Sequence, residues 1–304
     1  MRFTAAIFSL AVVAPVFAHP AHQARSADVV CEGSGNLVPA QSTNASPCNT
    51  EPSPEFLAAV AYIAAAEANG TLGTQNELNS RATVTIQTYF HVVASAQTVA
   101  GGYVTAAQIS QQMDYLNSAY ASTGYAFVNA GVDYTINAGW ARDGSELAMK
   151  KALRKGTYKD LNIYFQLALQ DDALGYCYFP VASHSTTSDN FAYDGCSIQA
   201  GSIAGGTLAN YNLGGTVAHE VGHWMGLLHT FQGAACSSTN DGIADTPAQN
   251  GYTQGCPSTR DSCPNAAGLD PIHNYMDYSY DVCYTEFTPN QITRMNSMWT
   301  TYRA

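Results

Sequence analysis

Positive charge is scarce in this chain. Its 304 residues include 12 Lys and Arg against 23 Asp and Glu, which gives a formal net charge of -11. A surface this acidic would repel the phosphate backbone of a nucleic acid and the anionic headgroups of a membrane. The composition therefore excludes nucleic-acid binding and a polybasic membrane patch.

Hydrophobic runs long enough to cross a bilayer are also missing. A spanning helix needs roughly 20 apolar residues, whereas the best internal candidate, residues 56–66, is short and is followed by Glu67. The N-terminus instead has the pattern of a secretory signal peptide, with a positive start, an apolar stretch over residues 3–14 and small residues before a cleavage point after Ala18. We expect residues 1–18 to be removed and the mature protein to be soluble and secreted.

Although charge is low, 46% of the residues are hydrophobic and 11% are aromatic, which is enough for a sizeable core. Residues 19–80 are irregular and rich in proline. They contain one expected helix, which Ser53 caps, with Pro54 at its first position and its end at Asn69-Gly70. We interpret this segment as a propeptide or N-terminal extension outside the main core, and residues 81–304 as the main domain.

Strand and helix patterns alternate in the main domain. Apolar residues at every second position predict strands, and apolar residues three to four apart predict helices. The expected strands are 83–93, 127–140, 161–169 and 196–202, and the expected helices are 105–121 and 145–155. This order predicts an α/β (α+β) fold, a twisted mixed β-sheet with a backing helix.

The cysteine count is even, at eight, which agrees with disulfides formed in an oxidising compartment. The cysteines form three groups along the chain: Cys31 and Cys48; Cys177 and Cys196; and Cys236, Cys256, Cys263 and Cys283. Pairing within groups predicts the disulfides Cys31–Cys48 and Cys177–Cys196 and leaves three arrangements for the last four cysteines.

Two acceptor patterns for N-glycosylation also fit an exported chain. They are Asn44-Ala45-Ser46 and Asn69-Gly70-Thr71. Asn44 and Asn69 are therefore candidate glycosylation sites, both before residue 80.

The residues that carry chemistry lie in one predicted helix, over residues 214–225. Its expected buried stripe consists of Leu213, Val217, Val221, Trp224 and Leu228. His219 and His223 are four residues apart, so both imidazoles project from one face and can bind one metal ion. Glu220 is adjacent to His219 and can act on a water at that metal without being a ligand.

The end of this helix supplies a third ligand. Gly226 can adopt the left-handed conformation that ends a helix, so that the chain turns back and brings His229 to the same metal. Three histidines with one open position are typical of catalytic zinc. Structural histidines inside a core helix are the alternative, but burying two histidines and a glutamate without a metal would be costly. We interpret His91, His184 and His273 as structural or surface residues.

This long zinc motif, followed by Asn274-Tyr275-Met276-Asp277-Tyr278, resembles the metzincins, and most closely the pappalysin family. The similarity is dense over residues 214–295 and includes the segments 241–247 and 268–279. It implies an irregular disulfide-bonded C-terminal subdomain and a Met-turn in which Met276 packs beneath the zinc histidines.

The resemblance also implies further site residues. Tyr278 would hydrogen-bond the oxyanion of the reaction. The last four cysteines would pair as Cys236–Cys263 and Cys256–Cys283. Asp241 and Asp245 would bind calcium, although two acids capping a proline-containing turn explain them as well.

A propeptide cysteine silences the zinc in some proenzymes of this family, and Cys31 is the candidate for this role here. The alternative is the Cys31–Cys48 disulfide, which we favour because a Cys31 switch would leave Cys48 unpaired in an oxidising compartment.

The sequence therefore predicts a secreted zinc endopeptidase, made as a proenzyme and monomeric, that acts on proteins or peptides. We expect the substrate to pair with residues 196–202 as an exposed edge strand. Asp281 would favour Arg or Lys after the cut, unless it is an exposed loop residue. Two other classes compete with this prediction, a zinc amidase and a non-catalytic binding protein on a protease scaffold.

Overall fold

The computed structural model describes residues 47–73, 82–236 and 240–304. The predicted signal peptide, Cys31 and the Asn44 acceptor pattern lie outside the described residues. Within them, no helix has the length and apolar character needed to cross a membrane.

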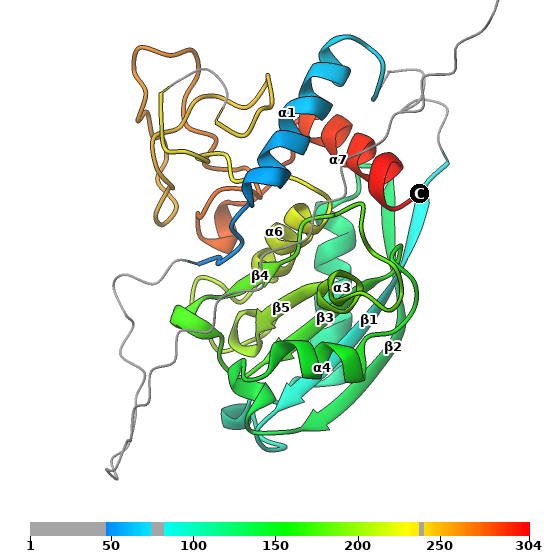
Figure 1. Ribbon diagram of the computed structural model, residues 1–304. Coiled ribbons are helices and arrows are strands. Elements are labelled where there is room, and N and C mark those ends of the chain that lie inside the picture. The colour runs from blue at the N-terminus through cyan, green and yellow to red at the C-terminus, as the bar shows by residue number, and fades with distance from the viewer. Residues whose placement is uncertain (1–46, 74–81, 237–239) are drawn as a thin grey trace, which may run out of the picture.

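Helices and strands alternate through the first two thirds of the chain, and one long helix ends it (Figure 1). The helices are α1 (Pro54–Ala68), α3 (Ala106–Ala119), α4 (Glu146–Leu153), α5 (Asp189–Tyr193), α6 (Gly215–Trp224) and α7 (Pro289–Tyr302). The strands are β1 (Val84–Ala94), β2 (Tyr125–Ile136), β3 (Leu161–Gln166), β4 (Gly175–Cys177) and β5 (Cys196–Gln199). The predicted helices and strands are all present, with small shifts at their ends, whereas β4, α5 and α7 were not predicted.

Strand order in the sheet is β2-β1-β3-β5-β4. The first four strands run parallel, and β4 pairs antiparallel with β5. The prediction that residues 196–202 form an exposed edge is wrong, because β5 lies between β3 and β4. The edge on this side of the sheet is β4, which has only three residues and therefore no alternating pattern to reveal it.

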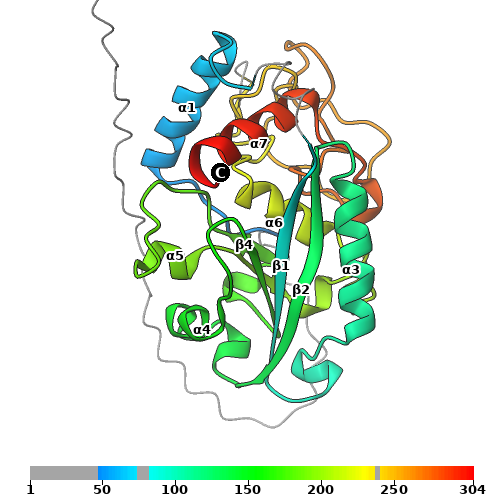
Figure 2. The same cartoon turned by 90° about the vertical axis from the view of Figure 1, so that its right-hand side faces the viewer.

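Helices cover both faces of the sheet (Figure 2). On one face, Ile163 and Phe165 of β3 share the main core with residues of α3 and α6. On the other face, Tyr164 packs with Met149 of α4. Successive residues of a strand point to opposite faces, so a strand covered on both faces is buried at every position, as β3 is.

The N-terminal segment packs more closely on the main domain than expected. Ser53 caps α1 and Pro54 opens it, as predicted. The helix lies beside α7 (Figures 1 and 2), the ring of Phe56 stacks on Phe179 at 4.0 Å, and Glu67 forms an ion pair with Arg294 of α7. Among the described residues, α1 stays outside the main core, as expected, but it builds a second, small core with Phe179, Leu228 and Met298.

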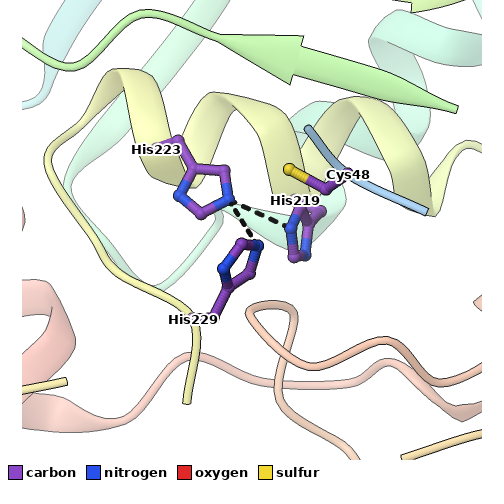
Figure 3. Close-up of side chains that lie close together, drawn as sticks. All are labelled: Cys48, His219, His223 and His229. Carbon is purple, nitrogen blue, oxygen red and sulfur yellow. Dashed lines mark hydrogen bonds between the residues drawn. The ribbon is translucent and has the colours of Figure 1, made fainter. Parts of the chain in front are cut away.

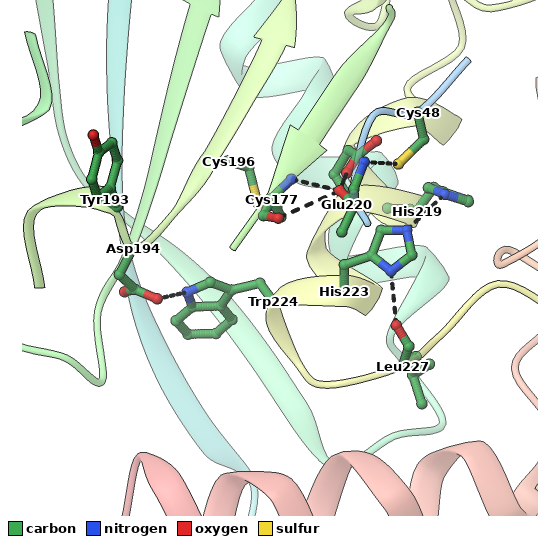
Figure 4. The surroundings of a disulfide bond; sticks show 12 residues. Cys48, Cys177, Tyr193, Asp194, Cys196, His219, Glu220, His223, Trp224 and Leu227 are labelled. Atoms are coloured by element: carbon green, nitrogen blue, oxygen red, sulfur yellow. Dashed lines mark hydrogen bonds between the residues drawn. A yellow bond between two sulfur atoms is a disulfide. The ribbon is translucent and has the colours of Figure 1, made fainter. Parts of the chain in front are cut away.

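The region between α6 and α7 is irregular and disulfide-bonded. Disulfides join Cys236 with Cys263 and Cys256 with Cys283. A third disulfide, Cys177–Cys196, ties β4 to β5 (Figure 4). All three are predicted pairs, and the mixed α/β fold with an irregular C-terminal subdomain is confirmed.

The C-terminal end of α6 is anchored to the rest of the domain by buried charge. Trp224 donates its indole N–H to Asp194 at 3.0 Å (Figure 4). Arg303, near the end of α7, binds both Asp194 at 2.8 Å and the Trp224 carbonyl at 3.1 Å. Since buried charge is stable only when paired, this cluster fixes the helix that carries two of the predicted ligands, His219 and His223.

Candidate active site

Helix α6 and the turn after it have the predicted form. The helix ends at Trp224, and Gly226 has φ of 92°, a conformation that a residue with a side chain rarely adopts. The Gly226 N–H donates to the His223 carbonyl at 2.8 Å, and the chain then reverses toward His229. One member of the predicted buried stripe is wrong: Leu213 precedes the helix and is 48% exposed.

The three predicted ligands converge (Figure 3). The Nε2 atom of His223 lies 3.1 Å from Nε2 of His219 and 3.1 Å from Nε2 of His229. Backbone carbonyls of Tyr275 and Leu227 lie 2.6 and 2.8 Å from Nδ1 of His219 and His223. A carbonyl can only accept, so each Nδ1 carries the proton and each Nε2 presents a lone pair. Lone pairs gathered in this way fit a shared cation.

Burial keeps the three imidazoles in the neutral form that binds metals. It lowers the pKa of His219 to about 4 and lowers the pKa values of His223 and His229 well below the usual range. The neighbouring imidazoles lower the latter two further.

Met276 and Tyr278 reach the site from the turn below α6. Met276 is fully buried, and its sulfur lies directly against Gly222, where a side chain would collide with it. The Tyr278 ring lies beside two ligands, with centroids 4.9 Å from His229 and 5.6 Å from His219. This is the arrangement that the resemblance implied.

The cysteine that the described residues bring to the site is Cys48. Its sulfur and one nitrogen of each of the three histidines lie within 4.8 Å of one another (Figure 3). In the described part of the chain, this is the only group of three or more His, Cys, Asp or Glu side chains that could hold a metal ion. Cys31, the switch residue considered from the sequence, lies outside the described residues, so the Cys31–Cys48 disulfide stays a prediction.

The segment around Cys48 occupies the free edge of β4. Cys48 forms a parallel bridge with Gly175. The Leu174 N–H donates to the Pro47 carbonyl at 2.9 Å, and the Asn49 N–H donates to the Gly175 carbonyl at 3.1 Å. The segment therefore binds as an additional strand, in the place where an extended peptide would pair.

The same segment contacts both predicted catalytic residues. Thr50 donates its hydroxyl to Oε2 of Glu220 at 3.1 Å, and the Tyr278 hydroxyl donates to the Cys48 carbonyl at 3.0 Å. Glu220 is fully buried, and burial raises its pKa to about 8, although hydrogen bonds from Cys48 and Thr50 oppose the shift.

Asp281 is buried, not an exposed loop residue. Its Oδ2 accepts the N–H groups of Leu213, Gly214 and Gly215 at 2.8, 3.1 and 3.1 Å, and so caps α6. Its Oδ1 makes no hydrogen bond among the described residues, and Asp281 lines a pocket with His219, Glu220 and Tyr278. Burial raises the pKa of Asp281 to about 6, although the three N–H donors oppose the shift.

Asp241 and Asp245 have separate surroundings. Asp245 accepts the Thr288 hydroxyl at 2.7 Å and the Asn290 N–H at 3.0 Å, at the start of α7. Asp241 is buried and accepts the Ile243 N–H at 3.0 Å. Asp245 thus fits the capping interpretation, and the calcium prediction gains no support.

The three remaining histidines of the described chain have structural partners, as expected. His91 is buried between Asp133 and Asn162, His184 stacks on Tyr158, and Nδ1 of His273 lies 2.7 Å from the Cys283 carbonyl.

Residues 149–300 match the model of the peptidase M43 family, described as pregnancy-associated plasma protein-A. The chain belongs to this peptidase family. It is 55% identical over 258 residues to an extracellular metalloprotease of Verticillium alfalfae, covering 84% of this chain and 90% of the relative. An extracellular metalloprotease of Neurospora crassa is 56% identical over 239 residues, which cover 79% of this chain and 83% of that relative. The predicted class, a secreted pappalysin-type metalloprotease, is confirmed.

Solved structures of a bacterial relative show the same fold. Mature mirolysin of Tannerella forsythia, in complex with a cleaved peptide, matches with a TM-score of 0.59 and 31% identity over 72% of this chain and 92% of its own. A Glu-to-Ala variant of promirolysin matches with a TM-score of 0.62 and 28% identity over 84% of this chain and 94% of its own. The match to promirolysin thus extends over more of this M43 peptidase than the match to mature mirolysin does.

Proposed function

We propose that this metalloprotease is a zinc-dependent endopeptidase, made as a latent proenzyme. The observation that carries the proposal is the convergence of three Nε2 atoms beside Glu220 and Tyr278. Bound by His219, His223 and His229, zinc would supply Lewis acidity at the scissile carbonyl and its attacking water. Glu220 takes the proton of the water and passes it to the leaving amine, and the Tyr278 hydroxyl stabilises the oxyanion.

The edge of β4 would align the substrate. Segment 47–49 already pairs with this edge through Leu174 and Gly175. A protein or peptide substrate in extended form would use the same backbone groups once this segment is gone.

Latency follows from what segment 47–50 contacts. The Cys48 sulfur lies in the histidine group, the Cys48 carbonyl accepts from Tyr278, and Thr50 binds Glu220. We infer that residues 19–80 are a propeptide and that Cys48, as a thiolate, would bind the zinc together with the three histidines. The greater coverage by the pro form of mirolysin supports this division of the chain.

Metal removal and product analysis test the endopeptidase proposal. We expect the matured protein to hold about one zinc per chain and to cut casein at internal bonds, to lose this activity on chelation, and to regain it with zinc. Mass spectrometry of the products distinguishes an endopeptidase from a zinc amidase and from a non-catalytic binding protein. Release of small groups without internal cuts would favour an amidase, and a protein that holds zinc but alters no substrate would favour a binding protein.

Asp281 predicts selectivity for a basic residue after the cut. Its Oδ1 is buried at the pocket and has no hydrogen-bond partner among the described residues. A Lys or Arg side chain of the substrate would provide that partner. Asp281→Asn keeps the shape and can still accept the three N–H groups that cap α6. We expect kcat/KM for peptides with Arg at this position to fall about 10- to 100-fold, as for the loss of a buried charged hydrogen bond, and kcat/KM for matched Leu peptides to change little. Equal losses for both peptides would show that Asp281 acts only as a helix cap.

A further inference from the structure

The edge strand approaches Glu220 at a residue without a side chain. Gly175 is the first residue of β4, and a Cβ atom built on it would lie 2.6 Å from Cγ, 2.8 Å from Oε1 and 3.0 Å from Cδ of Glu220. Carbon atoms that are not bonded make their closest favourable contact at about 3.5 Å. The Glu220 side chain therefore occupies the space that a side chain at position 175 would need.

Among the described residues, the Glu220 carboxylate receives its hydrogen bonds only from segment 47–50. Its Oε2 accepts from Thr50, its other bonding partner is Cys48, and its Oε1 makes no hydrogen bond among the described residues. When segment 47–50 leaves, packing against β4 is what remains in the described chain to fix this carboxylate.

The backbone at Gly175 does not itself require glycine. Gly175 is not among the glycines with positive φ, so alanine fits the conformation of the strand. Its N–H and carbonyl pair with segment 47–49. Gly175 and Cys177 share one face of β4, and the Cys177–Cys196 disulfide holds this strand to β5. The atoms that an added methyl group would meet belong to the Glu220 side chain and not to the backbone.

We propose that Gly175 is a positioning residue for Glu220: the missing side chain at the substrate-pairing edge creates the space that holds the carboxylate in its working position. This inference rests on the proposed role of Glu220 as general base. A base displaced by about 1 Å loses much of its effect, so a methyl group here would lower the rate of the chemical step while substrate pairing continues.

The test compares Gly175→Ala with Gly131→Ala in the matured protein. Gly131 lies in β2, and a Cβ there would have an ordinary contact of 3.6 Å with Tyr89, which makes it the matched control. We expect Gly175→Ala to lower kcat about 100-fold or more, with KM changed less than about threefold and full zinc content. Gly131→Ala should keep wild-type kcat.

A double-mutant cycle with Glu220→Ala tests the mechanism. Alanine lacks Cγ and every atom beyond it, which are the atoms that the added methyl group would meet, so the Gly175→Ala change should cost less than about threefold in the residual kcat of this background. Equal costs in both backgrounds, an unchanged kcat, or a loss expressed only in KM would overturn the proposal. If Gly175→Ala does not fold, the double variant should fold and bind zinc; its failure to fold would also overturn the proposal. A wild type that cuts no substrate would instead refute the endopeptidase function itself.

Discussion

Glu220→Ala is expected to lower kcat for peptide hydrolysis by about 10²–10⁴-fold, the usual contribution of a general acid–base residue, while the protein keeps its zinc. Glu220 is fully buried beside His219 and is not one of the converging ligands. Its removal leaves the three Nε2 atoms in place, together with the carbonyls that bind Nδ1 of His219 and His223, so metal binding and catalysis should separate.

The measurement is kcat on an internally quenched peptide together with zinc content, for the matured wild type, Glu220→Ala and the control Glu286→Ala. Glu286 is exposed, and its described contact with the Met-turn is the backbone bond from Tyr275, which alanine preserves. The control should match the wild type. Loss of zinc in Glu220→Ala would show that the carboxylate is part of the metal site, and retained activity would refute its role as base.

Local patterns were sufficient to predict that His219, His223 and His229 converge, because these residues are close in sequence. His219 and His223 share a helix face through the helical repeat alone, and Gly226 fixes the turn that returns His229. The same holds for α1 and α3, whose capping residues Ser53 and Thr105 stand at their starts. The helix α7 was missed although Thr288, Pro289 and Gln291 form a recognisable start signal.

Long-range pairing is what the sequence did not reveal. The edge position of β4 depends on how strands far apart in the chain are ordered, and three residues carry no period. For the same reason the sequence could not decide which N-terminal cysteine reaches the histidines, because that depends on Pro47 and Asn49 pairing with a strand more than a hundred residues away. The burial of Asp281 likewise follows from its capping of α6 across 66 residues.

Cys48→Ser in the proenzyme is the second change with a large expected effect. Serine keeps the size of the side chain but removes the thiolate, a far better zinc ligand than a hydroxyl. We expect the activity of the uncleaved chain to rise about 100-fold, which corresponds to a loss of about 3 kcal/mol in the stability of the latent state, in which segment 47–50 covers the site. The activity of the matured enzyme should stay unchanged, because the segment is absent from it.

Cys31→Ser is the control that separates the switch from the disulfide. If Cys48 binds the metal, Cys31→Ser leaves the proenzyme latent; if the two cysteines are bonded to each other, both variants should behave alike. A partly active proenzyme can cut itself, so the decisive measurement uses the inactive Glu220→Ala background. This protein is loaded with cobalt, because a thiolate ligand of cobalt gives a near-ultraviolet charge-transfer band. The band should vanish in Cys48→Ser and persist in Cys31→Ser. Its absence from the parent chain would mean that Cys48 lies beside the metal without binding it, and that latency comes from the strand pairing at β4 and from the contacts with Tyr278 and Glu220 alone.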